Sequence, residues 1–375
     1  MKKNILFVMP DLRGGGAEKV LVNLVNNLNS NKYSITVATL FNEGENIKRL
    51  NSNIRHIYLF NKIFRGYSII QKFFSPEFLY RRLTTENYDI VVAYLEGVVT
   101  RIVSGCNSKN TKKIAWVHTD PINSKNFNQP FRNLREIKKV YSTFNEIIGV
   151  SQVIAKNLNE LLLLTDEVGV KYNVIESENI KRLSKEEVRD FIVDRDIVNY
   201  CAVGRLIEVK GFERLLKVHK KLINNGVKCK LNIIGEGNEY KNLMDYIQKN
   251  NLEDSVELLG YKSNPYKYMK QMDLFVCSSY REGFSTAVTE ALILGVPVIT
   301  TACSGMDELL YDGKYGIIVD NNEEDLYKGL LNLITNQKLL EKYKILSKER
   351  GKLFNIKSTI QDVEILFDKF NKRTI

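Results

Sequence analysis

Two series of short apolar runs, separated by stretches with helical periodicity, constrain the fold of this chain more than any other feature. The first series comprises residues 3–9, 35–40, 54–59, 90–95, 114–117, 147–150 and 173–175. The second comprises residues 200–203, 230–234, 256–259, 274–277, 296–300 and 317–319. Short, continuously apolar strands that alternate with helices are typical of a parallel sheet covered on both faces. The pattern predicts an α/β fold with two doubly wound, Rossmann-like domains.

The chain of 375 residues is long enough for two domains with separate cores. We place an N-terminal domain at residues 1–178, a charged linker at 179–196, a C-terminal domain at 197–355 and a final helix at 356–375. We expect the two domains to face each other across a cleft, with the C-terminal helices packing back towards the first domain. Because doubly wound sheets bind ligands beyond the carboxyl ends of their strands, site residues are expected in strand-to-helix loops.

Composition excludes several classes of protein. The five cysteines are scattered without a CxxC pair, which favours buried thiols in a reducing compartment over disulfides or a metal site. No run approaches the roughly 20 apolar residues of a membrane-spanning helix. Residues 1–180 hold 24 Lys and Arg against 16 Asp and Glu, so most of the net charge of +11 lies in this half. Nucleic acid, a phosphorylated substrate or an anionic membrane surface could each explain that excess.

The most informative loop follows the apolar run 274–277. It carries the carboxylate of Glu282, a helix is expected to start near Ser285 or Thr286, and Glu290 lies in the second turn of that helix. The backbone N–H groups of residues 283–286 would form an anion site at the helix start. Two carboxylates beside an anion site repel phosphate, so they are expected to hold neutral hydroxylated groups. A sugar on one side of a diphosphate and a ribose on the other would fit.

Other strand-end loops carry further candidates. Gly15 and Gly16 open a helix after the first strand, where the backbone can approach a bound group closely. Arg205 and Lys210 flank a loop that starts at Gly204 and could clamp a diphosphate. His118 ends a strand in the N-terminal half. The remaining candidates are Gly235, Gly237 and Tyr261, in two glycine-containing turns that allow close contact with a planar base.

Together these motifs resemble the family 4 glycosyltransferases of the GT-B fold, over nearly the whole chain. The specific elements are the Gly-Arg…Lys-Gly loop at 204–211 and the two glutamates, Glu282 and Glu290, with seven residues between them. Such enzymes are retaining, use a nucleotide-sugar donor and need no metal or other cofactor. The resemblance implies that Arg205 and Lys210 bind the diphosphate, assisted by the amides of Gly283, Phe284, Ser285 and Thr286. It also implies that Glu282 holds donor-sugar hydroxyls, Glu290 holds the ribose, Tyr261 frames the base and His118 faces the donor sugar.

The resemblance predicts a cytoplasmic, metal-independent hexosyltransferase. We expect it to move a sugar from a nucleotide sugar, with UDP as the favoured nucleotide, to a lipid-linked or oligosaccharide acceptor in the synthesis of bacterial capsule, O-antigen or exopolysaccharide. The acceptor is expected to bind the N-terminal domain, 1–178, and the nucleotide sugar the C-terminal domain, 197–355. Catalytic roles are expected for His118, Arg205, Lys210 and Glu282. One feature departs from the family pattern: residues 176–179 replace the usual hinge sequence. The DxD at 194–196 is the metal signature of a different glycosyltransferase fold, but it precedes a strand instead of following one, so no metal site is expected there.

Residues 62–82 mix five cations and one acid with many aromatic side chains. Such a stretch can lie in the headgroup region of a membrane and guide a lipid-linked acceptor, which predicts peripheral contact with the inner face of the cell membrane. The cations include Lys62, Arg65 and Lys72, and the aromatics include Phe64, Tyr67, Phe73, Phe74 and Tyr80. The alternative is a core helix with basic flanks.

Two other functions remain open from the residues. A GT-B nucleotide-sugar epimerase would use the same nucleotide pocket without an acceptor, but its additional acid and base groups are not found in the loops at Gly14 or His118. A non-enzymatic basic protein would bind membrane or nucleic acid. Two glutamates among the cations of the expected site would repel a polyphosphate track, so no nucleic-acid partner is expected.

Overall fold

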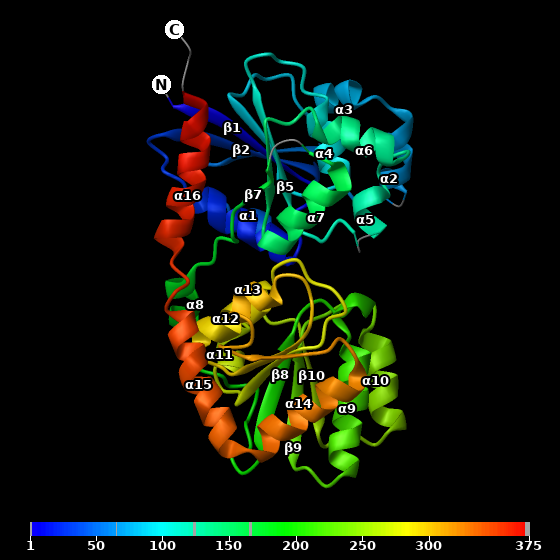
Figure 1. Cartoon of the computed structure of the whole chain (residues 1–375), viewed down its shortest axis with the longest axis vertical. Helices are drawn as coiled ribbons and strands as arrows, with labels where there is room; N and C mark the ends of the chain where they lie inside the picture. The colour runs from blue at the N-terminus through cyan, green and yellow to red at the C-terminus, as the bar shows by residue number, and fades with distance from the viewer. Residues whose placement is uncertain (1, 65, 123–124, 165–166, 372–375) are drawn as a thin grey trace. The chain divides into compact units, whose positions relative to one another are not determined.

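The computed structural model describes residues 2–64, 66–122, 125–164 and 167–371. The chain folds into two compact units (Figure 1). The first contains residues up to 175 together with those from 356 onwards, and the second is Glu176–Asn355. The segment expected to be a linker, 179–196, falls within the second unit. The final helix belongs to the first unit, as the expected return of the chain towards the N-terminal domain requires.

The first unit contains a parallel sheet of seven strands in the order β3-β2-β1-β4-β5-β6-β7. The strands are β1 Lys3–Met9, β2 Tyr33–Phe41, β3 Arg55–Phe60, β4 Ile90–Ala93, β5 Lys112–Val117, β6 Glu146–Gly149 and β7 Gly169–Val170. The helices are α1 Gly16–Asn27, η1 Glu45–Arg49, α2 Tyr67–Ile70, η2 Gln71–Phe73, α3 Pro76–Leu83, α4 Val98–Ser104, α5 Lys125–Asn128, α6 Leu134–Tyr141 and α7 Gln152–Leu162, with α16 Ile356–Asp368 and η4 Lys369–Asn371 at the end.

Apolar side chains on both faces of the strands explain this sheet. In β1, every residue from Ile5 to Met9 is fully buried, because β1 pairs with both β2 and β4 and is covered from both sides. The connections between strands are helical, as parallel pairing requires. The Ser151 hydroxyl accepts a hydrogen bond from the backbone N–H of Ile154 at 3.3 Å and so caps the start of α7.

One predicted strand is wrong. Residues 173–175 are not a strand, and the last strand of the first sheet is β7, at Gly169–Val170. Val174 and Ile175 are buried as the apolar pattern predicts, but the carbonyl of Val174 accepts its hydrogen bond from the side-chain amide of Asn23 on α1, at 3.1 Å. A side chain on a neighbouring helix therefore satisfies that carbonyl, and an apolar pattern alone does not distinguish this arrangement from a strand.

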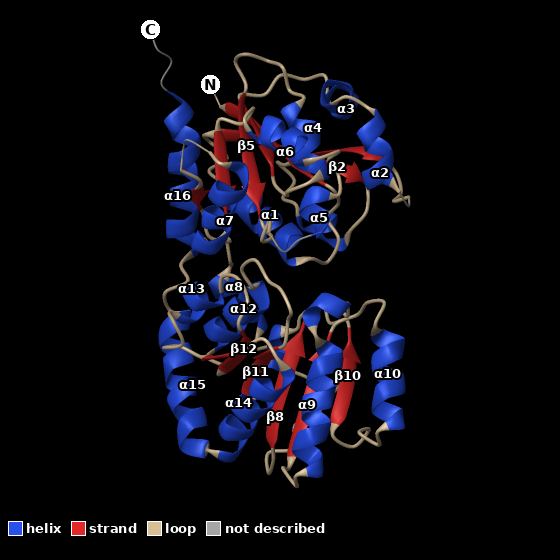
Figure 2. Cartoon of the chain, turned by 45° about the vertical axis from the view of Figure 1, so that its right-hand side comes forward, coloured by secondary structure: helices blue, strands red, loops and turns tan. Residues whose placement is uncertain are grey.

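The second unit repeats the architecture with six parallel strands, in the order β10-β9-β8-β11-β12-β13 (Figure 2). The strands are β8 Val198–Val203, β9 Cys229–Ile234, β10 Val256–Gly260, β11 Leu274–Cys277, β12 Val298–Thr301 and β13 Ile317–Val319. The helices are α8 Ser177–Leu183, η3 Glu208–Lys210, α9 Phe212–Asn224, α10 Tyr240–Lys249, α11 Tyr266–Met269, α12 Thr286–Leu294, α13 Met306–Leu310, α14 Glu323–Thr335 and α15 Gln337–Gly351. The predicted doubly wound architecture is confirmed in both units.

Side-chain contacts explain why the expected linker belongs to the second unit. Asp190 accepts hydrogen bonds from Tyr268 at 2.7 Å and from Lys262 at 2.6 Å. These bonds, that from Lys262 first, lower the pKa of the Asp190 carboxyl to about 2. The rings of Phe191 and Tyr268 pack together with their centroids 6.2 Å apart. The segment has no strand pattern, yet polar and aromatic contacts hold it against the second unit.

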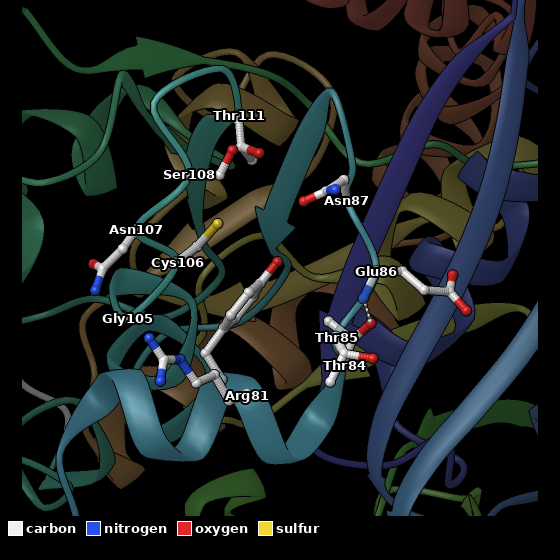
Figure 3. Close-up of a pocket in the computed structure, with 11 residues that line it drawn as sticks. Arg81, Thr84, Thr85, Glu86, Asn87, Gly105, Cys106, Asn107, Ser108 and Thr111 are labelled. Atoms are coloured by element: carbon white, nitrogen blue, oxygen red, sulfur yellow. Dashed lines mark hydrogen bonds between the residues drawn. The ribbon is translucent and has the colours of Figure 1, made fainter.

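A hollow of about 210 Å³ lies in the first unit at the amino ends of β4 and β5 (Figure 3). Its lining comes from α3 and from the loops that precede these two strands, and includes Arg81, Glu86 and Asn107. Glu86 is already paired with Arg55 at 2.7 Å. The hollow lies at the opposite edge of the sheet from the strand-to-helix loops. None of the helices among the described residues is both long enough and apolar enough to span a membrane.

The final helix, α16, completes the core of the first unit. Phe367 is fully buried and makes edge-to-face contacts with Phe7 and Tyr33, at 6.1 and 5.9 Å between ring centroids. Around it, Lys32 pairs with Glu364 at 3.4 Å. Chain that follows the second unit in sequence therefore stabilises the first, through aromatic packing with ion pairs at its rim.

We predict that Phe367→Ala destabilises the first unit by about 3–5 kcal/mol, because it removes a buried aromatic ring and leaves a cavity. Denaturant unfolding followed by tryptophan fluorescence measures this unit selectively, since the chain's single tryptophan is Trp116 in β5. Ile365→Ala is the matched control on the same helix, because Ile365 is 58% exposed, and it is expected to cost less than about 0.5 kcal/mol. Equal effects of the two substitutions would contradict the packing role of Phe367.

Candidate functional site

The predicted residues of the second unit gather where the strand order of its sheet reverses. Strand β8 pairs with β9 on one side and with β11 on the other, so the connections leave β8 and β11 in opposite directions across the sheet. Such a topological switch point is where open parallel sheets bind ligands. The loop 204–211 follows β8, and the loop 278–285 follows β11.

Backbone contact holds these two loops together. Gly211 has φ +65°, and a Cβ atom at this position would lie 2.1 Å from the carbonyl oxygen of Ser278. The Ser278 hydroxyl donates to the carbonyl of Lys210 at 3.0 Å, and the N–H of Tyr280 donates to the carbonyl of Val209 at 2.8 Å. Only glycine combines this backbone conformation with so close an approach. The glycine therefore sets the separation of the two loops.

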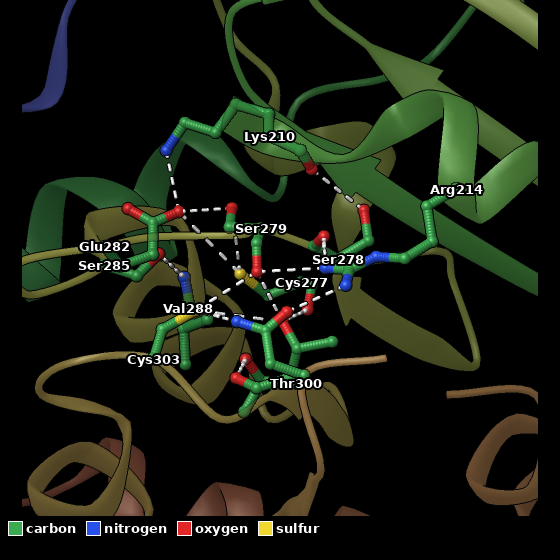
Figure 4. Close-up of polar contacts among 12 residues, drawn as sticks. Lys210, Arg214, Cys277, Ser278, Ser279, Glu282, Ser285, Val288, Thr300 and Cys303 are labelled. Atoms are coloured by element: carbon green, nitrogen blue, oxygen red, sulfur yellow. Dashed lines mark hydrogen bonds and ion pairs between the residues drawn. The ribbon is translucent and has the colours of Figure 1, made fainter. Parts of the chain in front are cut away.

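The Lys210 ammonium and the Glu282 carboxylate form an ion pair in the structure, at 2.7 Å (Figure 4). The same Oε1 atom of Glu282 accepts a hydrogen bond from the Ser279 hydroxyl at 2.6 Å. Burial acts to lower the pKa of Lys210, but the charge and hydrogen bond of Glu282 outweigh it and raise that pKa. Arg205 is exposed, and its charge opposes this rise. The structure thus brings Lys210 and Arg205, from the loop after β8, together with Glu282, from the loop after β11.

Arg214, which the sequence analysis did not select, anchors this arrangement from behind. It is 4% exposed on α9, donates to Asn321 Oδ1 at 2.8 Å, and also donates to the carbonyls of Ser278 and Ser279 (Figure 4). Its guanidinium lies 4.1 Å from the centre of the Tyr280 ring. Burial lowers the pKa of Arg214. The sequence does carry a signal that could have identified Arg214: it is an arginine on the apolar face of an amphipathic helix, three positions after Gly211.

Helix α12 starts where the sequence predicts. Ser285 is the N-cap, and its hydroxyl accepts from the N–H of Val288 at 3.4 Å. The first-turn N–H groups of a helix lack intrahelical partners, so an anion site remains chemically available there. A Cβ at Gly305, where φ is +78°, would lie 2.4 Å from the Gly283 carbonyl, so the loop after β12 packs closely on this helix start. The loop residues Gly283, Phe284, Ser285 and Thr286 all lie at this end of α12.

Glu290 is 4% exposed in the interior of α12, where its Oε1 accepts a hydrogen bond from the Tyr266 hydroxyl at 3.3 Å. Tyr266 begins α11, which follows β10. A buried carboxylate needs hydrogen-bond donors to offset its lost hydration. Tyr266 supplies one of them, and this role was not predicted from the sequence.

The glycines in the turns of the second unit allow the neighbouring loops to pack closely together. A Cβ at Gly235 would lie 1.9 Å from the carbonyl oxygen of Gly204, and one at Gly237 would lie 2.3 Å from the Leu206 carbonyl. The loops after β8 and β9 therefore touch through their backbones. Tyr261, immediately after β10, is 46% exposed and remains accessible at the same edge of the sheet.

Gly15, Gly16 and His118 lie in the first unit, whereas the other predicted site residues lie in the second. Helix α1 begins at Gly16, with Gly15 as its N-cap. The carboxylate of Glu18 lies over Gly15, within 2.0 Å of where a Cβ would stand. The expected anion site at this helix start is therefore faced by an acidic side chain of the protein itself, because a carboxylate is attracted to the same N–H groups.

His118 follows β5 and is 8% exposed. Its Nε2 atom is buried and has no hydrogen-bond partner among the described residues. The ring lies 4.8 Å from that of Tyr94, and burial lowers the pKa of the imidazole to about 3, so it is neutral at neutral pH. By contrast, both ring nitrogens of His219 are hydrogen-bonded, to Tyr200 at 2.6 Å and to Ser255 at 3.0 Å. A neutral His118 can exchange a hydrogen bond with a ligand but cannot supply charge.

The DxD sequence forms a local turn. The Asp194 carboxylate accepts from the N–H of Asp196 at 2.9 Å, and the Asp194 carbonyl accepts from the Asn199 amide at 2.6 Å. Both bonds organise the entry into β8. Across the described ranges, no group of three or more metal-binding side chains is found.

Comparison with known structures defines the class. HepE from Anabaena, in a crystal structure with UDP and glucose, matches this chain with a TM-score of 0.75 at 17% identity, over 98% of this chain and 99% of that one. Two parallel-sheet α/β units and this match give the chain a GT-B fold. Residues 14–179 match the model described as Glycosyltransferase Family 4, and residues 194–350 match Glycosyl transferases group 1.

Two curated relatives extend the comparison. An N-acetylgalactosamine-N,N'-diacetylbacillosaminyl-diphospho-undecaprenol 4-alpha-N-acetylgalactosaminyltransferase from Campylobacter jejuni is 31% identical over 287 residues, which cover 75% of this chain and 73% of that one. An uncharacterised glycosyltransferase from Methanocaldococcus jannaschii is 28% identical over 349 residues, or 83% and 84% of the two chains. The chain belongs to the family 4 glycosyltransferases, and it is a glycosyltransferase.

Proposed function

We propose that this enzyme transfers a hexosyl group from a UDP-sugar to a hydroxyl of a lipid-linked glycan, with retention of anomeric configuration and without a metal ion. The observation that carries the proposal is the cluster of Lys210, Glu282 and Ser279 at the switch point of the second sheet, beside the exposed Arg205. It combines cations for a diphosphate with a carboxylate for sugar hydroxyls. UDP and glucose in the HepE structure and the diphospho-undecaprenol in the name of the Campylobacter relative support the two substrate classes.

The charges suggest how the bond would break. As the anomeric carbon separates from the phosphate oxygen, negative charge grows on the departing UDP. Arg205, two remaining N–H groups of the Lys210 ammonium and the amides at the start of α12 would stabilise that charge. The acceptor oxygen forms the new bond on the same face, and its proton passes to the phosphate oxygen that leaves. The reaction thus yields UDP and a glycoside with no nucleophilic side chain.

The remaining site residues are assigned by chemistry. Glu282 accepts hydrogen bonds from donor-sugar hydroxyls in addition to those from Lys210 and Ser279. Glu290 accepts from the ribose hydroxyls, Tyr261 frames the uracil, and the glycine turns at Gly204, Gly235 and Gly237 keep the path to the nucleotide clear. In the first unit, Gly15, Gly16 and the neutral His118 are assigned to the donor sugar. The synthesis of capsule, O-antigen or exopolysaccharide is the proposed setting.

A UDP-release assay with a panel of UDP-sugars tests the proposal directly. Each donor is incubated alone, with p-nitrophenyl glycosides and with a polyprenyl-diphosphate-linked sugar, with and without EDTA. We expect acceptor-dependent UDP release that persists in EDTA, because side chains and amides supply the positive charge. An absolute requirement for Mg²⁺ or Mn²⁺ would contradict metal independence, and UDP release with sugar epimerisation but no acceptor would favour the epimerase.

Arg205→Ala and Lys210→Ala are each predicted to lower kcat by about 10²–10³, equivalent to roughly 2–4 kcal/mol of lost transition-state stabilisation. The physical reason is that both cations face the charge that grows on the leaving group. Lys217→Ala is the matched control, because Lys217 lies on α9 and pairs at the surface with Glu213 at 2.8 Å. Turnover near that of the wild type in both site variants would remove the diphosphate assignment.

Glu290→Ala is predicted to weaken UDP and UDP-sugar equally, whereas Glu282→Ala weakens UDP-sugar more than UDP. The distinction arises because ribose is common to both ligands and the sugar belongs to one. Calorimetric titration of both ligands against both variants measures it, with the exposed Glu253→Ala as a control. If Glu282→Ala reduced both affinities by the same factor, the sugar role of Glu282 would be wrong.

A second proposal concerns residues 62–82, where we propose contact with an anionic membrane. The exposed apolar side chains of this segment are Phe64 at 40%, Ile69 at 52%, Ile70 at 45%, Phe73 at 81%, Phe74 at 41% and Phe78 at 50%. The cations Lys62, Arg81 and Arg82 are exposed beside them, while Arg65 lies outside the described residues. Two expected membrane aromatics are corrected: Tyr67 and Tyr80, each 8% exposed, belong to the core. Tyr67 packs among other rings, 5.3 Å from Phe41.

We predict that the protein sediments with phosphatidylglycerol vesicles at low salt, and that Phe73→Ser combined with Phe78→Ser reduces the bound fraction at least tenfold. Each phenylalanine that leaves water contributes about 1.5–3 kcal/mol, and each cation near the surface adds about 1 kcal/mol. Ile192→Ser is the control, because Ile192 is 88% exposed in the second unit. Undiminished sedimentation of the double variant, or no binding by the wild type, would contradict the membrane role.

A further inference from the structure

Glu96 occupies in the first unit the place that the donor site occupies in the second. The strand order of the first sheet reverses between β1 and β4, and Glu96 follows β4 at this switch point. Glu96 is 8% exposed, and among the described residues burial and hydrogen bonds act on its carboxyl group but no cation does. Burying a carboxylate without a cation costs free energy unless hydrogen bonds offset the lost hydration. The hydrogen bonds of Glu96 therefore identify the groups that this side chain orients.

Both carboxylate oxygens reach the loop after β5. Oε2 accepts from the backbone N–H of His118 at 2.9 Å, and Oε1 accepts from the hydroxyl of Thr119 at 2.6 Å. Burial raises the pKa of Glu96, and the hydrogen bond from Thr119 acts against that rise. The two loops at the carboxyl edge of β4 and β5 are thereby joined through one side chain.

The short bond fixes the polarity of the Thr119 hydroxyl. A hydroxyl has one proton and two lone pairs, and the proton of Thr119 is directed at Glu96. The oxygen can therefore accept a hydrogen bond from a ligand but cannot donate one. Thr119 is only partly buried, and the neighbouring His118 has a buried Nε2 atom without a partner among the described residues. These two adjacent groups are suited to a hydroxylated ligand.

We propose that Thr119 binds the acceptor glycan by accepting a hydrogen bond from a hydroxyl next to the one that is glycosylated, and that Glu96 is a positioning residue that keeps Thr119 an obligate acceptor. The inference rests on the proposed function, and it places the acceptor in the first unit, next to the residues that are assigned to the donor sugar. It adds Thr119 as a residue that selects the acceptor, and Glu96 as a residue that sets the direction of the Thr119 hydroxyl. Neither was among the site residues predicted from the sequence.

The test is steady-state transfer by the full chain, with the UDP-sugar that the donor panel identifies and the p-nitrophenyl glycoside that accepts its sugar. Thr119→Val preserves the shape and removes the hydroxyl, so the acceptor KM is expected to rise about tenfold, the effect of losing one hydrogen bond to a neutral group. The donor KM and the slow hydrolysis of the donor in water are expected to stay unchanged. Thr119→Ser is expected to restore the acceptor KM, and the exposed Thr85→Val is the control.

Glu96→Gln supplies the sharper arm. If its amide oxygen accepts from the His118 N–H, its NH₂ group faces Thr119 and the Thr119 proton turns outward, which reverses the polarity of that hydroxyl. The acceptor KM is then expected to rise as in Thr119→Val, and the double variant is expected to be no worse than either single one, because both act through the same bond. Additive effects would overturn the role of Glu96.

The outcomes separate the two levels of proposal. An unchanged acceptor KM in Thr119→Val, or an equal rise in the donor KM, overturns this inference while leaving the glycosyltransferase assignment intact. Should Glu96→Gln fail to fold, the valine and serine variants of Thr119 still decide the question. A wild-type enzyme that transfers no sugar to any acceptor in the panel overturns the proposed function and this inference together.

Discussion

The close contact between the loops after β8 and β11 is the constraint on which the second unit depends. Gly211 lets the backbone of the loop after β8 approach that of the loop after β11. Arg214 holds the second of these loops by hydrogen bonds to two of its carbonyls. Because both loops are held, Ser279 and Lys210 meet on one oxygen of Glu282. A cation and a carboxylate that could each stay hydrated are thus held together, so the candidate site is preorganised by the fold.

The strand order around the switch point is the same in both units, but the charged groups that the loops carry there differ. In the second, the switch point carries an ion pair and an exposed arginine. In the first, it carries a buried glutamate that is satisfied by an N–H and a hydroxyl, beside a histidine that burial keeps neutral. Cations suit a diphosphate, whereas hydrogen-bonding groups without positive charge suit hydroxyls. The contrast follows from which side chains the loops present, since the strand order around each switch point is alike.

Much of the architecture could be predicted because it depends on local pattern. The apolar strands other than 173–175 and the start of α12 at Ser285 appear where the sequence indicates, since each needs only neighbours in the chain. The apolar run at 173–175 failed because its carbonyl is satisfied by a side chain 151 positions earlier. The prediction that Tyr67 and Tyr80 face a membrane is wrong for a related reason. A segment that mixes aromatic and basic residues does not show which rings face the core.

The sequence by itself determined the class of fold, the family, and the loops that carry the candidate site residues, because strand periodicity, glycines and glutamate spacing are properties of the chain order. Only the tertiary structure decided how those residues interact: that Lys210 pairs with Glu282, that Arg214 supports their loop, that Glu18 faces its own helix start, and that Glu96 orients Thr119. These are contacts between different strand-to-helix loops. They depend on the separation of backbones across a sheet, and a linear pattern does not encode distances between segments that meet only after folding.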